Sequence, residues 1–194
     1  MRVQGASLII QKWERLGSEV LVSNPWLTLR RDVCRLQNGM VIDDYYVLDE
    51  RDVACVVALT PERRLLLVEQ YKHGYGDLCL EIPGGVFASS EADPEAEARR
   101  EFREETGYDA PHWEKIGVLA VSPARTPIKM HLYLALDAVP VTDPHLDPTE
   151  AIQLHIVSLD EALEMMHTGA IHVATTVSGV LLALDILRRK GIPV

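Results

Sequence analysis

Three glutamates near the middle of the chain, Glu101, Glu104 and Glu105, stand at positions i, i+3 and i+4. On a helix this spacing places the three side chains on one face, with Glu97 one turn earlier on the same side. Like charges stacked in this way destabilise a helix by roughly 0.2–0.5 kcal/mol per pair. One interpretation is a solvated acidic face paired with neighbouring arginines. The other is a site for a hard divalent cation, because Mg²⁺ and Mn²⁺ prefer carboxylate oxygens.

The segment before these glutamates favours the metal site. It reads Glu-Ile-Pro-Gly-Gly over residues 81–85, and its glycines allow the backbone to approach a ligand and offer carbonyl oxygens. A carbonyl added to the carboxylates makes an all-oxygen site. The chain has a formal net charge of −10, so it would repel a phosphorylated substrate unless a cation stood between the two. Bound metal ions would supply that cation and could activate an attacking water.

Residues 85–108 closely resemble the Nudix box, G-x5-E-x7-R-E-U-x-E-E-x-G-U, in which U is aliphatic or aromatic. Gly85 and Glu91 match its first part, and residues 100–108 match its second part at every defined position. Eight residues rather than seven separate Glu91 from Arg100, so the loop before the helix is one residue longer than the box prescribes. This insertion leaves the role of Glu91 open and does not affect the helix glutamates.

The resemblance implies a role for each matching residue of the box. Glu101, Glu104 and Glu105 would hold the metal ions, Mg²⁺ or alternatively Mn²⁺, or position the catalytic water. The carbonyl of Gly84 would be a further metal ligand. Arg100 would orient the glutamates by salt bridges rather than touch the metal. These five residues are therefore the expected centre of the site.

Stretches outside the box resemble the ADP-ribose and nucleoside-diphosphate-sugar pyrophosphatase branch of the Nudix family. They are residues 69–72 (Glu-Gln-Tyr-Lys) and 80–85, together with Pro123, which stands near the place of a proline in ADP-ribose-cleaving members. In that branch the basic residue after Gln-Tyr often contacts phosphate, which indicates Lys72, although a plain strand-end lysine is an equal alternative. Glu81 is a candidate contact for the metal or the terminal sugar, or else an edge-strand carboxylate.

Three further residues are candidates for the site. The branch places a late glutamate in the loop before the penultimate strand, which here makes Glu150 the candidate general base or extra metal ligand. Arg125 could reach a substrate phosphate, and Trp26 could stack on a nucleobase. Each has an ordinary alternative, namely an acidic loop residue, a basic loop residue and a buried or interface aromatic.

Apolar runs and turn residues predict the strands that position these side chains. The continuous run Val53–Leu59 suits a strand that is buried on both faces. The Asn-Gly pair at residues 38–39 tolerates positive φ, so a type I′ hairpin is expected between arms at 26–36 and 40–48. Further strands are expected over residues 64–71, 78–82, 113–121, 129–136 and 152–157.

Three helices are expected from capping residues and apolar spacing. Asp93 caps the first helix, which carries the glutamates and ends before Gly107. A capping box at Ser158 begins the second. The third spans residues 173–189 and has apolar side chains at helical spacing.

Two parts of the chain are therefore expected. Residues 49–194 would form a Nudix-type domain of the α/β (α+β) class, in which a mixed β-sheet is sandwiched between helices. Residues 1–48 would form a small β-rich extension that carries no catalytic pattern, and the resemblance implies that it helps to form a homodimer. A chain of 194 residues, 47% of them hydrophobic, is long and apolar enough for one large core.

Composition narrows the range of partners. The net charge of −10 argues against the phosphate backbone of a nucleic acid as partner. Cys34, Cys55 and Cys79 form no C-x-x-C pair, so neither a zinc site nor a disulfide framework is expected. The N-terminus does not match a signal peptide and no apolar run approaches membrane-spanning length, so we expect a cytoplasmic protein without a membrane partner.

Three functions stay open at this point. The first is Mg²⁺-dependent hydrolysis of the pyrophosphate in a nucleoside diphosphate linked to another moiety, either ADP-ribose (to AMP and ribose 5-phosphate) or a nucleotide sugar. The second is a Nudix-fold nucleotide-binding or sensor protein without catalysis. The complete set of helix glutamates favours an enzyme over this second function. The third is a Nudix hydrolase of nucleoside triphosphates or dinucleoside polyphosphates.

Overall fold

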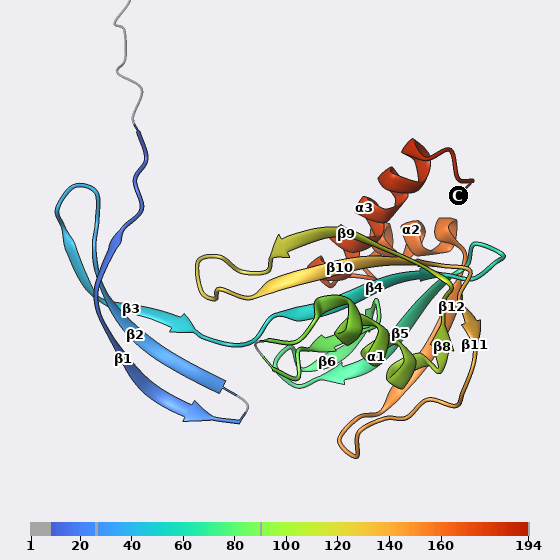
Figure 1. Ribbon diagram of the computed structural model, residues 1–194, viewed down its shortest axis with the longest axis horizontal. Helices are drawn as coiled ribbons and strands as arrows, with labels where there is room; N and C mark the ends of the chain where they lie inside the picture. Colours follow the sequence, from blue (N-terminus) through green and yellow to red (C-terminus); the bar gives the residue numbers. More distant parts are fainter. Residues whose placement is uncertain (1–8, 26, 90, 194) are drawn as a thin grey trace, which may run out of the picture. The chain divides into compact units, whose positions relative to one another are not determined.

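The computed structural model describes residues 9–25, 27–89 and 91–193 (Figure 1). The chain divides into two compact units. The smaller unit comprises residues 1–50 and 122–127, and the larger unit comprises residues 51–121 and 128–194. Within the described ranges, no helix is long and apolar enough to cross a membrane.

The smaller unit is a three-stranded antiparallel sheet of β1 (Glu14–Asn24), β2 (Leu27–Arg35) and β3 (Val41–Leu48). The hairpin predicted around residues 38–39 is confirmed, but its predicted type I′ turn is wrong. Gly39 has a positive φ of 85°, whereas Asn38 does not. Asn38 Oδ1 instead accepts a hydrogen bond from Met40 N at 3.0 Å. This local bond favours a three-residue loop that ends in a left-handed glycine.

The larger unit is built around a seven-stranded mixed sheet in the order β12-β5-β4-β10-β9, with β6 beside β5 and β7 beside β4. β10 runs parallel to β4, and the other neighbouring strands are antiparallel. A ribbon of two short strands and three helices complete the described part of this unit. The elements are β4 (Val53–Leu59), β5 (Leu65–Lys72), β6 (Asp77–Glu81), β7 (Gly84–Val86), α1 (Pro94–Thr106), β8 (Tyr108–Asp109), β9 (His112–Ala120), β10 (Lys129–Leu136), β11 (Val139–Pro140), β12 (Ile152–Val157), α2 (Leu159–Thr168) and α3 (Ala174–Arg189).

Alternate residues of the central strands face two apolar cores on opposite sides of this sheet. Val57 and Leu59 of β4 pack in the core that α2 and α3 cover. Val56 and Ala58 pack in the other core with Phe102 of α1. This alternation follows from the two-residue period of a strand. The helices therefore cover both faces of the sheet (Figure 1), and the predicted α/β class with a mixed sheet between helices is confirmed.

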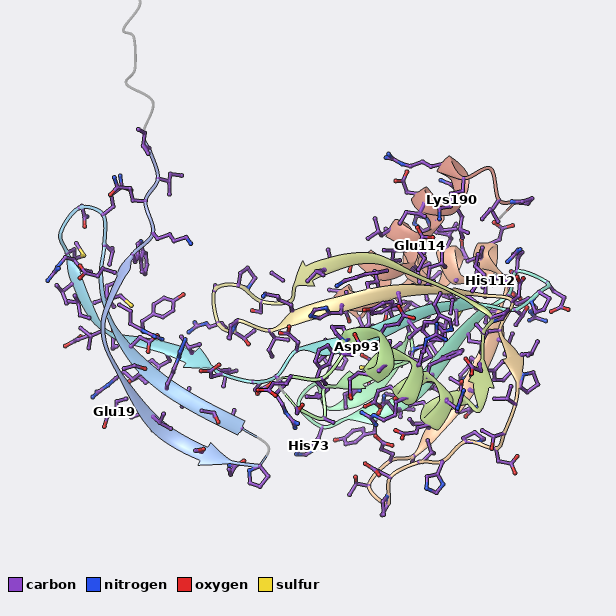
Figure 2. All side chains as sticks on the ribbon, in the orientation of Figure 1. Glu19, His73, Asp93, His112, Glu114 and Lys190 are labelled. Carbon is purple, nitrogen blue, oxygen red and sulfur yellow. The ribbon has the colours of Figure 1, made fainter. Side chains whose placement is uncertain are left out.

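Side-chain caps and ion pairs fix the ends of the helices. Asp93 Oδ2 accepts a hydrogen bond from the first turn of α1 at 3.1 Å, and Gly107, with φ 73°, ends the helix as predicted. Ser158 forms the predicted capping box at the start of α2. Beyond the end of α3, Lys190 forms an ion pair with Glu114 of β9 (Figure 2). This ion pair links the end of α3 to the sheet, in addition to the contacts of α3 in the core.

The structure adds three short strands that the sequence pattern does not predict, namely β7, β8 and β11. β7 lies where the Pro-Gly-Gly sequence indicates only a turn. Gly84 and Gly85 pair there with Cys55 and Ala54 of β4. A Cβ on Gly84 would lie 2.2 Å from Ala54 O, so only a residue without a side chain allows this approach. The pairing carries the glycine backbone to the edge of the cavity described below.

Candidate functional site

A cavity of about 250 Å³ is lined by α1, β5, β7 and the loop before β12. It brings together seven of the residues predicted for the site: Lys72, Gly84, Arg100, Glu101, Glu104, Glu105 and Glu150. The rest of its lining consists of Gln70, Gly85, Val86, His145 and Asp147. The lining contains five carboxylates and only two permanent cations, so the cavity is negatively charged and attracts cations.

Arg100 forms ion pairs with three glutamates on the acidic face of α1. Its guanidinium lies 2.8 Å from Glu97 Oε2, 2.5 Å from Glu101 Oε1 and 2.6 Å from Glu104 Oε2. Partial burial opposes its charge, but the hydrogen bond to Glu97 and the charges of Glu101 and Glu104 raise the pKa of Arg100 above its ordinary value. A permanently charged arginine with planar donors can hold several carboxylates in fixed directions. This geometry is the one expected of a residue that orients the glutamates.

Glu105 is the most deeply buried carboxylate of the cavity, with 5% of its surface exposed. Burial raises the pKa of Glu105 to about 8, although a hydrogen bond from Gly84 N at 2.8 Å acts in the opposite direction. The charge of Glu101 raises it further. Burial also raises the pKa of Glu101, where Arg100 opposes the shift and Glu104 adds to it. Without a metal, Glu105 therefore keeps its proton at neutral pH, and a cation bound beside it would favour the charged form.

A hard divalent cation fits this set of donors, since the donor atoms are oxygens of carboxylates and of the backbone at the edge of the cavity. Among the described residues, no three acidic, histidine or cysteine side chains are already arranged around a common metal position. One oxygen of each glutamate already accepts a hydrogen bond. Arg100 donates to Glu101 and Glu104, and Gly84 N donates to Glu105. The other oxygen of each glutamate stays available, so a cation would share these carboxylates with Arg100.

Lys72 and Glu81 lie side by side on the neighbouring strands β5 and β6. Lys72 Nζ is 3.1 Å from Glu81 Oε2, and Glu81 is the more buried of the pair. Lys72 lines the cavity, whereas Glu81 does not. Lys72 is thus available to a substrate phosphate, and Glu81 is placed to hold it rather than to contact a ligand in the cavity.

The loop before β12 supplies the remaining carboxylates. Glu150 Oε2 accepts a hydrogen bond from Asp147 N at 3.1 Å, and Glu150 N donates to Asp147 O at 2.9 Å. Glu150 lines the same cavity as Glu101 and Glu105, and after burial its charge is a further contribution to the raised pKa values of both. A general base needs this proximity to the other catalytic groups.

The sequence of the chain matches two families of known proteins. The NUDIX domain family matches residues 49–176, and the family described as the nucleoside diphosphate sugar hydrolase N-terminal domain matches residues 13–48. The first match covers well over half of the chain. The chain belongs to the Nudix family. The predicted family is therefore confirmed, and the protein is a Nudix hydrolase.

Several curated relatives resemble this Nudix hydrolase over most of their length. A methanol dehydrogenase activator of Bacillus methanolicus is 33% identical over 85% of this chain and 89% of the relative. An ADP-ribose pyrophosphatase of Mycobacterium tuberculosis is 28% identical over 87% and 82%. A GDP-mannose pyrophosphatase of Cronobacter sakazakii is 29% identical over 91% and 96%. A solved structure described as an ADP compounds hydrolase has the same fold, with a TM-score of 0.84 and 21% identity over 96% of this chain and 100% of that one.

Glu91 and Glu97 lie in different surroundings in this Nudix hydrolase. Glu91 is exposed and does not line the cavity. Glu97 is buried, and its Oε2 accepts hydrogen bonds from Ala88 N at 3.0 Å and from Arg100 at 2.8 Å. Burial acts against its charge, but these two bonds hold the pKa of Glu97 below its ordinary value. Glu97 thus ties the loop after β7 to Arg100.

Gln70, His145 and Asp147 line the cavity but were not among the residues predicted for the site. Gln70 could have been found, because it stands two residues before Lys72 on the same strand and so faces the same side. Asp147 belongs to the loop that was singled out for Glu150. His145 had no local signal, since a backbone bond from His145 N to Glu104 O at 2.8 Å brings it to the cavity.

Besides Glu81, the predicted substrate contact Arg125 does not line the cavity. Arg125 belongs to the smaller unit, where it is exposed and where its carbonyl accepts a hydrogen bond from Leu48 N at 2.9 Å. This bond fastens the loop over residues 122–127 to β3. Trp26 lies outside the described residues. The roles suggested for both residues stay predictions.

The buried charge of Glu105 predicts how the stability of this Nudix hydrolase depends on pH when no metal is present. The folded pKa of about 8 lies above the ordinary value of 4.5, so between these values the folded state binds more protons than the unfolded state. The free energy of unfolding should therefore fall as the pH rises through this window. Glu105→Gln removes the titrating group, and the variant should be more stable than the wild type at pH 9 by roughly 5 kcal/mol.

Urea unfolding in EDTA at pH 5, 7 and 9 measures this effect. Glu95→Gln is a suitable control, because Glu95 is a half-buried glutamate of the same helix that pairs with Arg99 at 2.8 Å. The control should follow the pH dependence of the wild type. If Glu105→Gln followed it too, Glu105 would not carry a raised pKa in the folded protein.

Proposed function

We propose that this Nudix hydrolase cleaves the pyrophosphate bond of a nucleoside diphosphate linked to another moiety, and that ADP-ribose or a nucleotide sugar is its substrate. The observation that carries the proposal is the convergence of the α1 glutamates, Lys72 and Glu150 on one cavity. The names of the relatives support the substrate class, since they include an ADP-ribose pyrophosphatase and a GDP-mannose pyrophosphatase. The match of residues 13–48 to a nucleoside diphosphate sugar hydrolase domain supports it independently.

Each part of the cavity has a task in this reaction. Glu101, Glu104, Glu105 and the carbonyl of Gly84 would hold Mg²⁺, or alternatively Mn²⁺. When bound, the metal supplies positive charge for the phosphates and lowers the pKa of a bound water. Arg100 keeps the helix carboxylates in their directions, as its three ion pairs indicate.

The two residues opposite the helix act on the substrate and the water. Lys72 contacts a phosphate oxygen and balances its charge, with Glu81 holding the ammonium group in place. Glu150, which lines the same cavity as the helix glutamates, orients the attacking water and accepts its proton. Water then attacks one phosphorus, the bridging P–O bond breaks, and two monophosphates leave the cavity.

A substrate panel tests this function. The protein is incubated with Mg²⁺ and, separately, with ADP-ribose, GDP-mannose, other nucleotide sugars, dinucleoside polyphosphates and nucleoside triphosphates. The products are then identified by chromatography, with EDTA as the metal-free arm. We expect AMP and ribose 5-phosphate from ADP-ribose, or two monophosphates from a nucleotide sugar. Turnover confined to triphosphates or dinucleoside polyphosphates would contradict the proposed substrate class, and binding without turnover would indicate a sensor.

We also propose that the protein is a homodimer in which the smaller unit takes part. This unit buries few side chains of its own, and its strands and the residues beside them expose many large apolar side chains: Trp13, Leu16, Val20, Leu21, Val22, Met40, Val41, Tyr46 and Leu48. Exposed apolar surface concentrated on a small sheet is typical of a protein interface. A second copy of the chain would cover it.

Light scattering coupled to gel filtration tests the dimer. The wild type should have about twice the chain mass of 21.7 kDa. The double variant Val20→Glu, Val22→Glu should shift toward the monomer, because charges on this sheet resist burial. Leu181→Glu is the matched control, since Leu181 is a similarly exposed apolar residue of α3 in the larger unit. A wild type that is monomeric at working concentration would refute the proposal.

A further inference from the structure

The loop over residues 141–151 is fastened to the C-terminal end of α1 by backbone hydrogen bonds. Val141 N and Thr142 N donate to Gly107 O at 2.9 and 3.1 Å, and His145 N donates to Glu104 O at 2.8 Å. The pairing of β8 with β11 brings the start of this loop to the helix end. These bonds satisfy carbonyls that every helix leaves unpaired at its C-terminal end. The helix that carries the glutamates and the loop that carries Glu150 are thus joined.

Gly107 makes this junction possible, because it has no side chain. A Cβ at this position would lie 2.3 Å from Thr142 O and 3.2 Å from the Cδ of Pro144. The carbonyl would have to retreat by about 0.7 Å to reach 3.0 Å, below which real Cβ atoms do not come. The backbone of Thr142 therefore occupies the space that a side chain at position 107 would fill.

Helix termination alone does not require this empty space, and Gly169 shows the difference. It ends α2 in the same left-handed conformation, with φ 82° against 73° for Gly107. A Cβ on Gly169 would meet nothing within 4 Å. The two glycines thus share a backbone requirement, and only Gly107 also has a packing requirement.

We propose that Gly107 is a positioning residue for the reaction, which seats the loop over residues 141–151 so that Glu150 faces the α1 glutamates. The proposal rests on the function proposed above for Glu150. Glu104 belongs to the cavity and also binds the loop, because its side chain lines the cavity and its backbone carbonyl accepts a hydrogen bond from His145 N. Any movement of the loop therefore changes the distance between Glu150 and the helix carboxylates.

The comparison of Gly107→Ala with Gly169→Ala tests this role. Both variants place an L-residue in a left-handed position, so both carry the same backbone strain. A displacement of about 1 Å in a catalytic group can cost about 10²-fold in rate. We expect Gly107→Ala to lower kcat by about that factor with KM little changed, and Gly169→Ala to stay near the wild-type rate.

Amide hydrogen exchange gives a readout that does not depend on activity. In Gly107→Ala, the amides of Val141, Thr142 and His145 should exchange faster than in the wild type, because their acceptors on α1 move away. In Gly169→Ala they should exchange at the wild-type rate. Equal exchange in the two variants would overturn the proposal and leave Gly107 as a helix terminator only.

A double variant separates this proposal from the function assigned to Glu150. If Gly107 acts through Glu150, then Gly107→Ala should have little further effect on kcat in a Glu150→Gln background. If Gly107→Ala lowered kcat in the Glu150→Gln background by the same factor as in the wild type, Gly107 would not act through Glu150. If Glu150→Gln alone matched the wild type, the proposed role of Glu150 would fail, and the positioning of a catalytic group by Gly107 would fail with it.

Asparagine variants keep the test decisive if Gly107→Ala does not fold. Asparagine adopts the left-handed conformation more readily than alanine, and its Cβ meets the same atoms of Thr142 and Pro144. Gly107→Asn should therefore fold and still release the loop, whereas Gly169→Asn should not change its exchange. A Gly107→Asn protein with wild-type exchange and wild-type kcat would overturn the proposal.

Discussion

Replacing Glu104 by Gln is expected to lower kcat by roughly 10²–10³-fold at saturating Mg²⁺ while the fold stays intact. Glutamine keeps the shape of the side chain, and its oxygen can still accept the hydrogen bond that Arg100 donates to Glu104 at 2.6 Å. The variant loses one negative charge from the proposed metal site, so the effect belongs to metal binding and to the charge that develops in the reaction. Glu104 is 40% exposed, which makes its charge unimportant for core packing.

Two measurements check the Glu104 prediction. The Mg²⁺ dependence of the rate should shift to higher concentrations in Glu104→Gln, and circular dichroism and the unfolding midpoint should stay close to the wild type. Glu95→Gln is the control, because the Glu95 side chain on the same helix is exposed to a similar extent (44%) and pairs only with Arg99 among the ion pairs of the described residues. A variant that turns over at nearly the wild-type rate would rule out Glu104 as a metal ligand.

Glu150→Gln is expected to lower kcat and kcat/KM together, by about 10²–10⁴-fold, with KM little changed. The amide can still accept the hydrogen bond from Asp147 N, so the loop should keep its shape. What is lost is the ability to accept a proton from the attacking water, and this loss affects the transition state rather than substrate binding.

Kinetics with the best substrate of the panel separates three outcomes for Glu150. Wild-type values of both constants would make it an ordinary loop residue, and a raised KM with kcat preserved would make it a substrate-binding residue. Only the joint fall of kcat and kcat/KM agrees with a general base. Asp143→Asn is the control, because Asp143 is an acidic residue of the same loop that does not line the cavity.

Much of the fold could be predicted because its signals are local. Strands β4, β10 and β12 have the predicted bounds, since β4 is a continuous apolar run and the other two are mostly apolar. Helix α1 also has its predicted ends, because Asp93 and Gly107 mark them by their own chemistry. The spacing of the glutamates on that helix was enough to predict an acidic cluster, which the cavity contains.

The remaining features depend on contacts between distant segments, which spacing does not reveal. β7 forms only because the glycines pair closely with β4, and the sequence shows them as a turn. His145 reaches the cavity through the carbonyl of Glu104, and Glu81 is turned toward Lys72 rather than into the cavity. Glu97 was noticed on the acidic face, but its bond to Ala88 N requires the path of the loop after β7.

The ion pairs of Arg100 bear on whether the newly made chain can fold before a metal ion binds. Four stacked carboxylates on one helix would resist folding until a cation arrived, as thiolates do in small zinc domains that unfold without metal. Arg100 lies within 2.8 Å of three of these carboxylates and supplies a counter-ion from the same helix. We therefore expect the protein to fold before any metal binds. Chelation should leave a folded, inactive protein that regains activity when the cation returns.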